Sequence, residues 1–376
     1  MIYRDFCGKK LSALGMGCMR LPVTDEKNSS IDKSATREMI DYAIKNGVNY
    51  FDTAWGYHDG ESENIVGEIL SEYPRDSFYI ATKFPGYDVS NMTKVEEIFE
   101  EQLKKCRVDY FDFYMFHNVC ESNIEEYLDR QYGIYDYLMK QKENGRIRHL
   151  GFSTHGTLDT MKRFIDAYGK DMEFCQIQLN WIDWKMQNAK AKVEMLKEQG
   201  IPVWVMEPVR GGKLATLEEE YANELRVLRP DATPAEWSFR FLQSIPEVVV
   251  TLSGMSDMKQ LIENIATYGE EKPLSEKETE KLFSVADAMT SKTTLPCTAC
   301  RYCTTHCPME LDIPNLIDLY NEHVYSGGGF LAPMAIGSLP DDKKPSACLS
   351  CRACEAVCPQ NIKISEMMSD FVEKLK

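Results

Sequence analysis

The sequence predicts an α/β protein in which a (β/α)8 TIM barrel is followed by a small helical domain rich in cysteine. Two observations predict this architecture: short apolar runs alternate with helical stretches eight times before residue 290, and eight of the 13 cysteines lie beyond it. Alternation of this kind is typical of a parallel sheet with crossover helices, and eight strands indicate closure into a barrel. We therefore expect the barrel in residues 1–290 and the second domain in residues 291–376.

Each expected strand is a short apolar run, and a helical segment lies between each run and the next. The eight runs cover residues 11–17, 48–52, 78–82, 113–117, 149–153, 174–180, 202–207 and 248–254. The active site of such a barrel lies where its strands end, so polar residues at those positions are the first candidates for a site. The link to the second domain is expected in the polar stretch 290–294.

Composition excludes several classes of protein. The chain has 376 residues, of which 43% are hydrophobic and 27% charged, so it can bury a sizeable core. Its net charge of -16, from 43 Lys and Arg against 59 Asp and Glu, disfavours nucleic acid as a partner. The chain contains no run of 18 apolar residues that would predict a membrane span. Its first residues also lack an apolar run like that of a signal peptide. We therefore expect a cytoplasmic protein. No heptad pattern indicates a coiled-coil dimer, and the sequence makes no prediction of oligomeric state.

The cysteines of the second domain form two runs of identical spacing, C-x2-C-x2-C-x3-C-P. They are Cys297, Cys300, Cys303 and Cys307, then Cys348, Cys351, Cys354 and Cys358. Zinc also binds CxxC pairs, but a zinc site needs neither a third cysteine at the same spacing nor a proline after the last cysteine. The runs resemble those of bacterial ferredoxins, which implies two 4Fe-4S clusters, each completed by the fourth cysteine of the other run.

The residues between the two runs predict a helical version of this module. Forty residues separate Cys307 from Cys348, too many for the compact strand-rich version. They include a segment with apolar residues at helical spacing after Pro314, which Gly327, Gly328 and Gly329 interrupt. We therefore expect a helical ferredoxin-like domain.

Polar residues end three consecutive strands of the barrel. Asp52 ends the second strand, Lys83 follows the third and His117 ends the fourth, and Tyr57 lies five residues beyond Asp52. Singly, each has an ordinary structural role: a helix cap, a solvated cation or a satisfied core histidine. Together, at the same ends of neighbouring strands, they predict a catalytic group at one mouth of the barrel.

The segments that carry these residues, NYFDTAWGYHDGESENIVGEIL, ATKFP and FYMFHNV, resemble the aldo-keto reductase family. The resemblance covers most of residues 1–285 and implies that residues 9–22 supply a hairpin under the barrel and the first strand. It also implies that Asp52, Tyr57, Lys83 and His117 form the catalytic tetrad. A phenol with a pKa of about 10 is a poor acid at neutral pH, so a neighbouring Lys83 would lower that pKa while His117 orients the carbonyl oxygen.

The same resemblance implies the contacts of a nicotinamide cofactor, NAD(P)H. Ser153 and Gln176 would hold the nicotinamide amide beside Met206, which stands where the family often has an aromatic residue. The remaining candidates follow the last two strands: Pro208, Gly211 and Gly212 near the pyrophosphate, and Ser253, Gly254, Met255, Gln260 and Asn264 near the adenosine. Because Lys259 is the only cation there, the segment favours NAD over NADP. Arg20, at the end of the first strand, is a further candidate, either as an anchor for cofactor or substrate or as an ion-pair partner.

Two hypotheses for function follow. In the first, the chain is an oxidoreductase that reduces an aldehyde or ketone with NAD(P)H, acting on a small-molecule carbonyl or alcohol. Its two 4Fe-4S clusters then serve electron transfer or the structure of the C-terminal module. In the second, it is an electron-transfer protein whose clusters do the redox work with a one-electron carrier protein while the barrel binds a partner or cofactor. A nicotinamide transfers two electrons at once and each cluster passes one, so a flavin between them stays open although no flavin fingerprint is visible.

Overall fold

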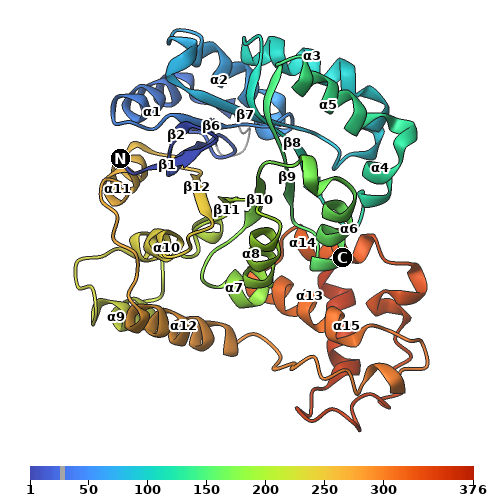
Figure 1. Ribbon diagram of the computed structural model, residues 1–376. Helices are drawn as coiled ribbons and strands as arrows, with labels where there is room; N and C mark the ends of the chain where they lie inside the picture. Colours follow the sequence, from blue (N-terminus) through green and yellow to red (C-terminus); the bar gives the residue numbers. More distant parts are fainter. Residues whose placement is uncertain (26–29) are drawn as a thin grey trace. The chain divides into compact units, whose positions relative to one another are not determined.

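The structure is a computed structural model that describes residues 1–25 and 30–376. Eight parallel strands form a closed barrel, and helices lie around the outside of the strands (Figure 1). The predicted (β/α)8 fold is therefore confirmed. The barrel strands are β3 (Leu14–Gly17), β6 (Tyr50–Asp52), β7 (Tyr79–Phe84), β8 (Phe111–Val119), β9 (Ile147–Thr154), β10 (Cys175–Gln178), β11 (Val203–Met206) and β12 (Val248–Ser253).

The first predicted strand, residues 11–17, is two elements in the structure. β2 (Lys9–Ser12) pairs with β1 (Tyr3–Phe6) in an antiparallel hairpin, and β3 begins the barrel two residues later. The apolar run continues through both because Leu11 belongs to the same buried cluster as β12 residues of the barrel interior. Apolar spacing alone therefore did not reveal the break at Ala13. A second small hairpin joins β4 (Val23–Asp25) to β5 (Ser30–Ile31).

Helices connect successive barrel strands, and polar side chains at their first residues fix where several begin. Asp32 accepts a hydrogen bond from the backbone of Ala35, and Asp257 does the same for Gln260, which satisfies free N–H groups of the first turn. The helices are α1 (Lys33–Lys45), α2 (Ser62–Leu70), α3 (Val95–Cys106), α4 (Ile124–Leu128), α5 (Ile134–Glu143), α6 (Leu158–Tyr168), α7 (Asp183–Met186), α8 (Ala189–Glu198), α9 (Glu219–Arg226), α10 (Pro234–Gln243), α11 (Met258–Thr267) and α12 (Glu276–Ser291).

Aromatic side chains fill the amino-terminal end of the barrel. Phe113 packs edge to face on Phe174 with 5.3 Å between ring centroids, and Phe6 from the hairpin packs in the same way on Trp204 at 5.0 Å. These rings belong to one buried cluster with residues of five barrel strands. The interior at this end is thus a packed core that holds the strands in register, and the opposite end is free to form a site.

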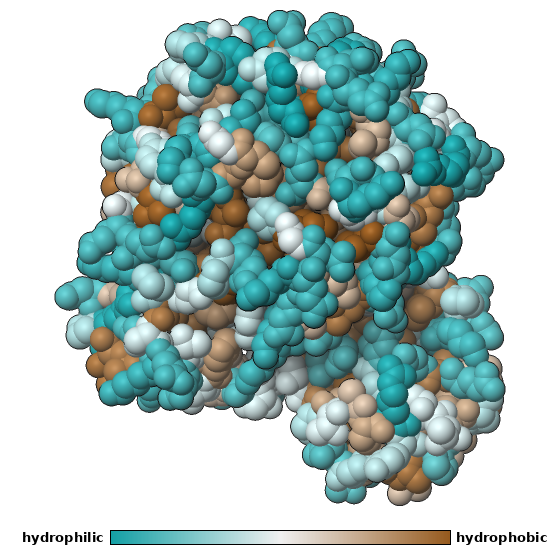
Figure 2. Space-filling model, viewed as in Figure 1, coloured by the Kyte–Doolittle hydropathy of each residue, from teal (hydrophilic) through white to brown (hydrophobic). Residues whose placement is uncertain are grey.

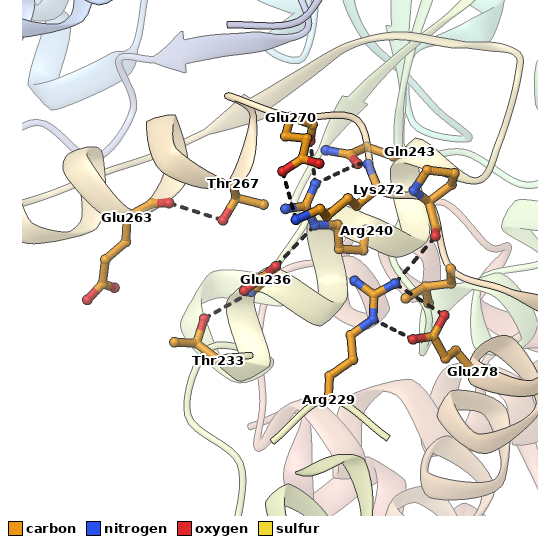
Figure 3. Close-up of polar contacts among 12 residues, drawn as sticks. Arg229, Thr233, Glu236, Arg240, Gln243, Glu263, Thr267, Glu270, Lys272 and Glu278 are labelled. Carbon is orange, nitrogen blue, oxygen red and sulfur yellow. Dashed lines mark hydrogen bonds and ion pairs between the residues drawn. The ribbon is translucent and has the colours of Figure 1, made fainter. Parts of the chain in front are cut away.

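Arginine side chains fasten the last helices of the barrel to one another (Figure 3). Arg240 on α10 bonds the carboxylate of Glu236 and the backbone carbonyl of Glu270. Arg229, after α9, forms an ion pair of 2.5 Å with Glu278 on α12. These contacts fix the connection between α11 and α12, which sequence patterning did not single out.

The second part of the chain is helical, as expected. It contains α13 (Ile313–Ser326), α14 (Leu331–Gly337) and α15 (Ile364–Lys374). Pro314 lies in the first turn of α13, and Gly327 ends the helix with a left-handed φ of 70°, a conformation that glycine adopts without strain. Leu316, Ile317 and Phe371 are buried in one apolar cluster of this unit.

The chain divides into two compact units, Met1–Lys281 and Leu282–Lys376, and α12 spans the division. The boundary predicted at residue 290 lies near the end of α12 and stays a prediction. Hydrophilic side chains cover most of the face seen in Figure 2. Among the helices that the structure describes, none has the length and hydropathy that a bilayer-spanning segment needs.

Candidate active site and iron-sulfur sites

The four residues of the expected tetrad meet at the carboxyl ends of β6, β7 and β8. Nζ of Lys83 donates hydrogen bonds to Oδ1 of Asp52 at 2.6 Å, to the backbone carbonyl of Thr53 at 2.7 Å and to the hydroxyl of Tyr57 at 3.3 Å. The ring of His117 lies edge to face with that of Tyr57, with 6.1 Å between centroids. The three N–H bonds of the ammonium are therefore all used, one of them on the phenol.

Burial controls the charges in this group. The side chains of Lys83 and Asp52 are 0% and 3% exposed. Burial lowers the pKa of Lys83, but Asp52 and Tyr57 more than offset this, so that pKa is raised and the lysine is charged. Burial, with the charge of Lys83, holds the pKa of His117 well below its usual value. The tetrad thus combines a charged lysine with a neutral imidazole.

The net pKa of the phenol differs from the expectation. Lys83 lowers the pKa of Tyr57, as the sequence argument required, but burial raises it by more, and the pKa is raised overall. The physical reason is that the hydroxyl is enclosed, which disfavours the phenolate. In consequence Tyr57 is protonated at neutral pH and carries a proton that it can donate.

A buried network behind Lys83, which sequence reasoning missed, holds the end of β7. Gln102 on α3 donates to the backbone carbonyl of Lys83 at 2.9 Å and to Glu63 on α2 at 2.8 Å, and Thr82 donates to the same carboxylate. The two helices can approach this closely because Gly67 has no Cβ, which would lie 2.5 Å from the Cα of Cys106. The sequence signal that could have revealed this network is a glutamate and a glutamine on the apolar faces of two consecutive predicted helices.

Aromatic side chains from two loops lie around the tetrad. Tyr87, after β7, lies edge to face with His117, with 5.1 Å between centroids, and it is 40% exposed. Nζ of Lys105 lies 4.1 Å from the ring centre of Trp55 and donates to the backbone carbonyl of Gly60. These contacts hold both ends of the loop that carries Tyr57. Sequence reasoning did not single out Tyr87, although it follows Lys83 by four residues.

Three candidates for nicotinamide binding lie side by side on β9, β10 and β11. Ser153 and Gln176 are register partners in adjacent strands, and Nε2 of Gln176 lies 3.8 Å from the sulfur of Met206. Oε1 of Gln176 is buried without a hydrogen-bond partner among the described residues. Oγ of Ser153 accepts from the backbone N–H of Asn118 and has its own proton to donate. The pair thus fits an amide, which supplies both a donor and an acceptor.

Arg20 lies among the segments that follow the last two strands. A Cβ on Gly254 would lie 3.2 Å from the Cβ of Arg20, and one on Gly211 would lie 3.4 Å from its Nη2. The backbone at Gly211 and Gly212 is left-handed, with φ of 66° and 99°. The structure therefore brings Arg20 together with two of the expected cofactor segments, at an exposed position.

The other adenosine and pyrophosphate candidates divide into buried and exposed residues. Asn264 donates to Oγ of Ser253 at 3.1 Å, and Gln260 is exposed and bonds Asp257 and the backbone of Ser256 at the start of α11. Met255, however, is 1% exposed and Pro208 is also buried, so their side chains serve packing. The only cation predicted there, Lys259, pairs with Glu263 at 3.9 Å.

The eight cysteines of the second unit line two pockets of four. One pocket is lined by Cys297, Cys300, Cys303 and Cys358, and the other by Cys307, Cys348, Cys351 and Cys354. Each pocket thus takes three cysteines from one run and the fourth from the other run. The rest of the lining is largely apolar, for example Ile317 and Ile362 in the first and Ile313 and Met368 in the second. Four thiolates in an apolar shell fit a 4Fe-4S cluster.

This barrel, with a lysine, an aspartate and a tyrosine at its mouth, is that of an oxidoreductase. The profile of the aldo/keto reductase family matches residues 13–287, and that of the 4Fe-4S dicluster domain matches residues 296–362. The chain belongs to the aldo/keto reductase family and carries a C-terminal 4Fe-4S dicluster domain.

Relatives match the barrel part of the chain. A probable aldo-keto reductase 1 of Glycine max is 27% identical over 313 residues, covering 73% of this chain and 86% of its own length. An NADH-specific methylglyoxal reductase of Escherichia coli is 23% identical, covering 68% and 89%. Among solved structures, aldo-keto reductase AKR11C1 from Bacillus halodurans has a TM-score of 0.63 at 23% identity, covering 77% of this chain and 97% of its own. An aldo-keto reductase from Klebsiella pneumoniae in complex with NADPH has a TM-score of 0.57 at 18% identity, covering 76% and 96%. These structures show the shared fold.

Proposed function

We propose that the barrel reduces the carbonyl group of a small aldehyde or ketone with a nicotinamide cofactor, and that Tyr57 donates the proton. The observation that carries this proposal is the position of Nζ of Lys83, fully buried between the carboxylate of Asp52 and the hydroxyl of Tyr57. A structural ion pair does not need a phenol as its third partner, whereas a proton donor needs a neighbouring cation to stabilise the anion it leaves.

A bound nicotinamide supplies or accepts a hydride. The chain's residues do the rest: Ser153 and the unpaired oxygen of Gln176 would hold the carboxamide of that cofactor. The neutral imidazole of His117 orients the carbonyl oxygen next to the hydroxyl of Tyr57. Tyr57 donates its proton to that oxygen, the charge of Lys83 stabilises the phenolate that remains, and solvent returns the proton.

NAD is the cofactor that the adenosine segment favours. Recognition of the 2′-phosphate of NADP requires a cation, and the segment after β12 offers only Lys259, an exposed side chain 3.9 Å from Glu263. The relative from Escherichia coli is described as NADH-specific, whereas the Klebsiella structure contains NADPH. Competition between the two cofactors in the reduction assay measures the preference, which we expect to favour NADH.

The dicluster domain favours a second candidate function, electron transfer. Two pockets of four cysteines would hold two 4Fe-4S clusters, which pass one electron at a time to a carrier protein. A two-electron hydride and a one-electron cluster do not exchange directly, so this function requires a mediator such as a flavin. An anaerobic titration with NADH distinguishes the two functions. Bleaching of the cluster absorbance supports electron transfer, and an unchanged band during aldehyde reduction shows that the barrel works alone.

The substitution Tyr57→Phe tests the reductase. Removal of the hydroxyl is expected to lower kcat/KM for aldehydes by about 100-fold to 10,000-fold, the usual effect of losing a general acid. Tyr73→Phe is the matched control because its hydroxyl bonds Asp41, away from the tetrad, and this variant should keep wild-type kinetics. If Tyr57→Phe reduced aldehydes as well as the wild type does, the tetrad would not be the catalytic group.

A further inference from the structure

A second group of potential ligands lies at the amino-terminal end of the barrel, away from the tetrad. It consists of Cys7 in the turn of the β1–β2 hairpin, His149 near the start of β9 and Glu173 just before β10. One ligand atom from each of the three residues lies within 4.8 Å of the other two. None of the three has a role in the reductase or in cluster binding.

The distances suit a small ion after minor adjustment. Oε2 of Glu173 is 2.6 Å from Nδ1 of His149 and 4.0 Å from Sγ of Cys7. A tetrahedral zinc site has Zn–S bonds of about 2.3 Å and Zn–N or Zn–O bonds of about 2.0 to 2.1 Å, which separates neighbouring ligand atoms by about 3.3 to 3.6 Å. Shifts of about 1 Å would therefore convert the present cluster into a coordination shell. Cys7 is in an exposed hairpin turn, where such a shift is least hindered.

The surroundings hold two of the ligands in place. Lys142 pairs with the other oxygen of Glu173, Oε1, at 2.5 Å, which orients the carboxylate and leaves Oε2 for the cluster. The ring of His149 stacks on Phe113 with 5.1 Å between centroids and meets the edge of Phe6. Outer contacts of this kind commonly fix the ligands of a metal. The exposed side of Cys7 leaves room for water as a fourth ligand.

We propose that Cys7, His149 and Glu173 bind a zinc ion that fastens the hairpin to β9 and β10. A thiolate, an imidazole and a carboxylate are the three ligand types that zinc takes in proteins, whereas magnesium takes oxygen ligands. The thiolate and the carboxylate bring two negative charges to the ion, and Lys142 adds one positive charge on the far side of the carboxylate. Binding releases the proton of the thiol to solvent, and no electron is transferred.

Alkylation of Cys7 in the holoprotein tests the site. The exposed cysteines in the described part of the chain are Cys7, Cys300 and Cys351, and the last two belong to the cluster motifs. With both clusters loaded and air excluded, N-ethylmaleimide should modify Cys7, and mass spectrometry of peptides follows the rate. Free zinc at ten times its dissociation constant should slow this reaction about tenfold, because about one site in eleven stays empty. Magnesium should leave the rate unchanged.

The variant Glu173→Gln keeps the thiol and the side-chain size, and it should abolish protection by zinc. Glu271→Gln is the matched control, since Glu271 pairs with Arg4 of the same hairpin and is not in the cluster, and it should keep the protection. Equal rates with and without zinc in the wild type, or full protection in Glu173→Gln, would overturn the proposal.

X-ray absorption at the zinc edge of the wild-type protein gives a second readout that does not depend on a variant. One sulfur and three nitrogen or oxygen neighbours support the site. Several sulfur neighbours would show zinc in a cysteine pocket of the second unit and would refute it.

Discussion

Removal of the carboxylate that faces Lys83 should destabilise the barrel more than most single substitutions. The variant Asp52→Asn keeps the size of the side chain but leaves a buried ammonium whose remaining partners, the carbonyl of Thr53 and the hydroxyl of Tyr57, are neutral. Loss of one member of a buried ion pair costs about 3 to 5 kcal/mol because the other charge is left without compensation. We expect a loss in this range, since both side chains are almost fully enclosed.

A double substitution separates charge compensation from packing. Lys83→Met should cost less than Asp52→Asn, because burial already raises the pKa of Asp52 and the lone carboxyl can take up a proton. Lys83→Met combined with Asp52→Leu removes both charges and fills the space with apolar groups, and such replacements are often neutral or stabilising. The double variant is therefore expected to lie within about 2 kcal/mol of the wild type, although it should have no reductase activity.

Urea unfolding followed by tryptophan fluorescence measures these differences. All five tryptophans lie in residues 1–281, so the signal reports the barrel rather than the cluster domain. Far-ultraviolet circular dichroism at zero urea confirms that each variant is folded. A loss below about 1 kcal/mol for Asp52→Asn, or a double variant as unstable as the sum of its singles, would refute the argument that uncompensated charge dominates.

Three further predictions concern charge and cluster ligation. Arg229 lowers the pKa of Glu278 to about 2 from 4.5, so the pair stabilises the barrel above about pH 4.5 and this contribution is lost as the pH falls through 2. Arg229→Met should lower the urea midpoint at pH 6, and the gap to the wild type should narrow at pH 3. Because the pKa of His117 is well below 6.5, kcat/KM for reduction should stay flat from about pH 6 to 8. An inflection between about pH 6 and 8 that disappears in His117→Gln would contradict a neutral His117. Cys307→Ser and the double variant Cys307→Ser with Cys348→Ser should each retain about four of about eight irons per chain, since both cysteines line one pocket. An iron content near zero in the double variant would place them in different clusters.

Much of the fold followed from local patterns. Seven of the eight predicted strands overlap single barrel strands, because each is a buried apolar run bounded by turns, and the helix at Ile313–Ser326 begins and ends where Pro314 and Gly327 indicated. The exception was the run 11–17, which continues apolar through a hairpin strand and a barrel strand. Periodicity records which residues are buried and does not record which sheet buries them.

Residue types and spacing determined the candidates at both sites by themselves. The ends of successive parallel strands meet at one mouth, so Asp52, Lys83 and His117 could be grouped from their places in the chain, and the cysteine runs are specific to clusters. Tertiary structure alone decided the electrostatic balance: enclosure makes the net pKa of Tyr57 higher, although Lys83 acts in the expected direction. Desolvation depends on every atom around a group, which no sequence spacing encodes.

Long-range packing decided the remaining features. The side chain of Met255 is buried in the core, and Gln102, nineteen residues beyond Lys83 in the chain, reaches the backbone of that lysine from its helix. Cys7 and Glu173 are 166 residues apart in sequence and still lie 4.0 Å from each other, because closure of the barrel brings its first hairpin under β9 and β10. The sequence determined which chemical groups this protein carries and the order of its strands, and the closed barrel decided which groups are neighbours, since a circular sheet joins residues that are far apart in the chain.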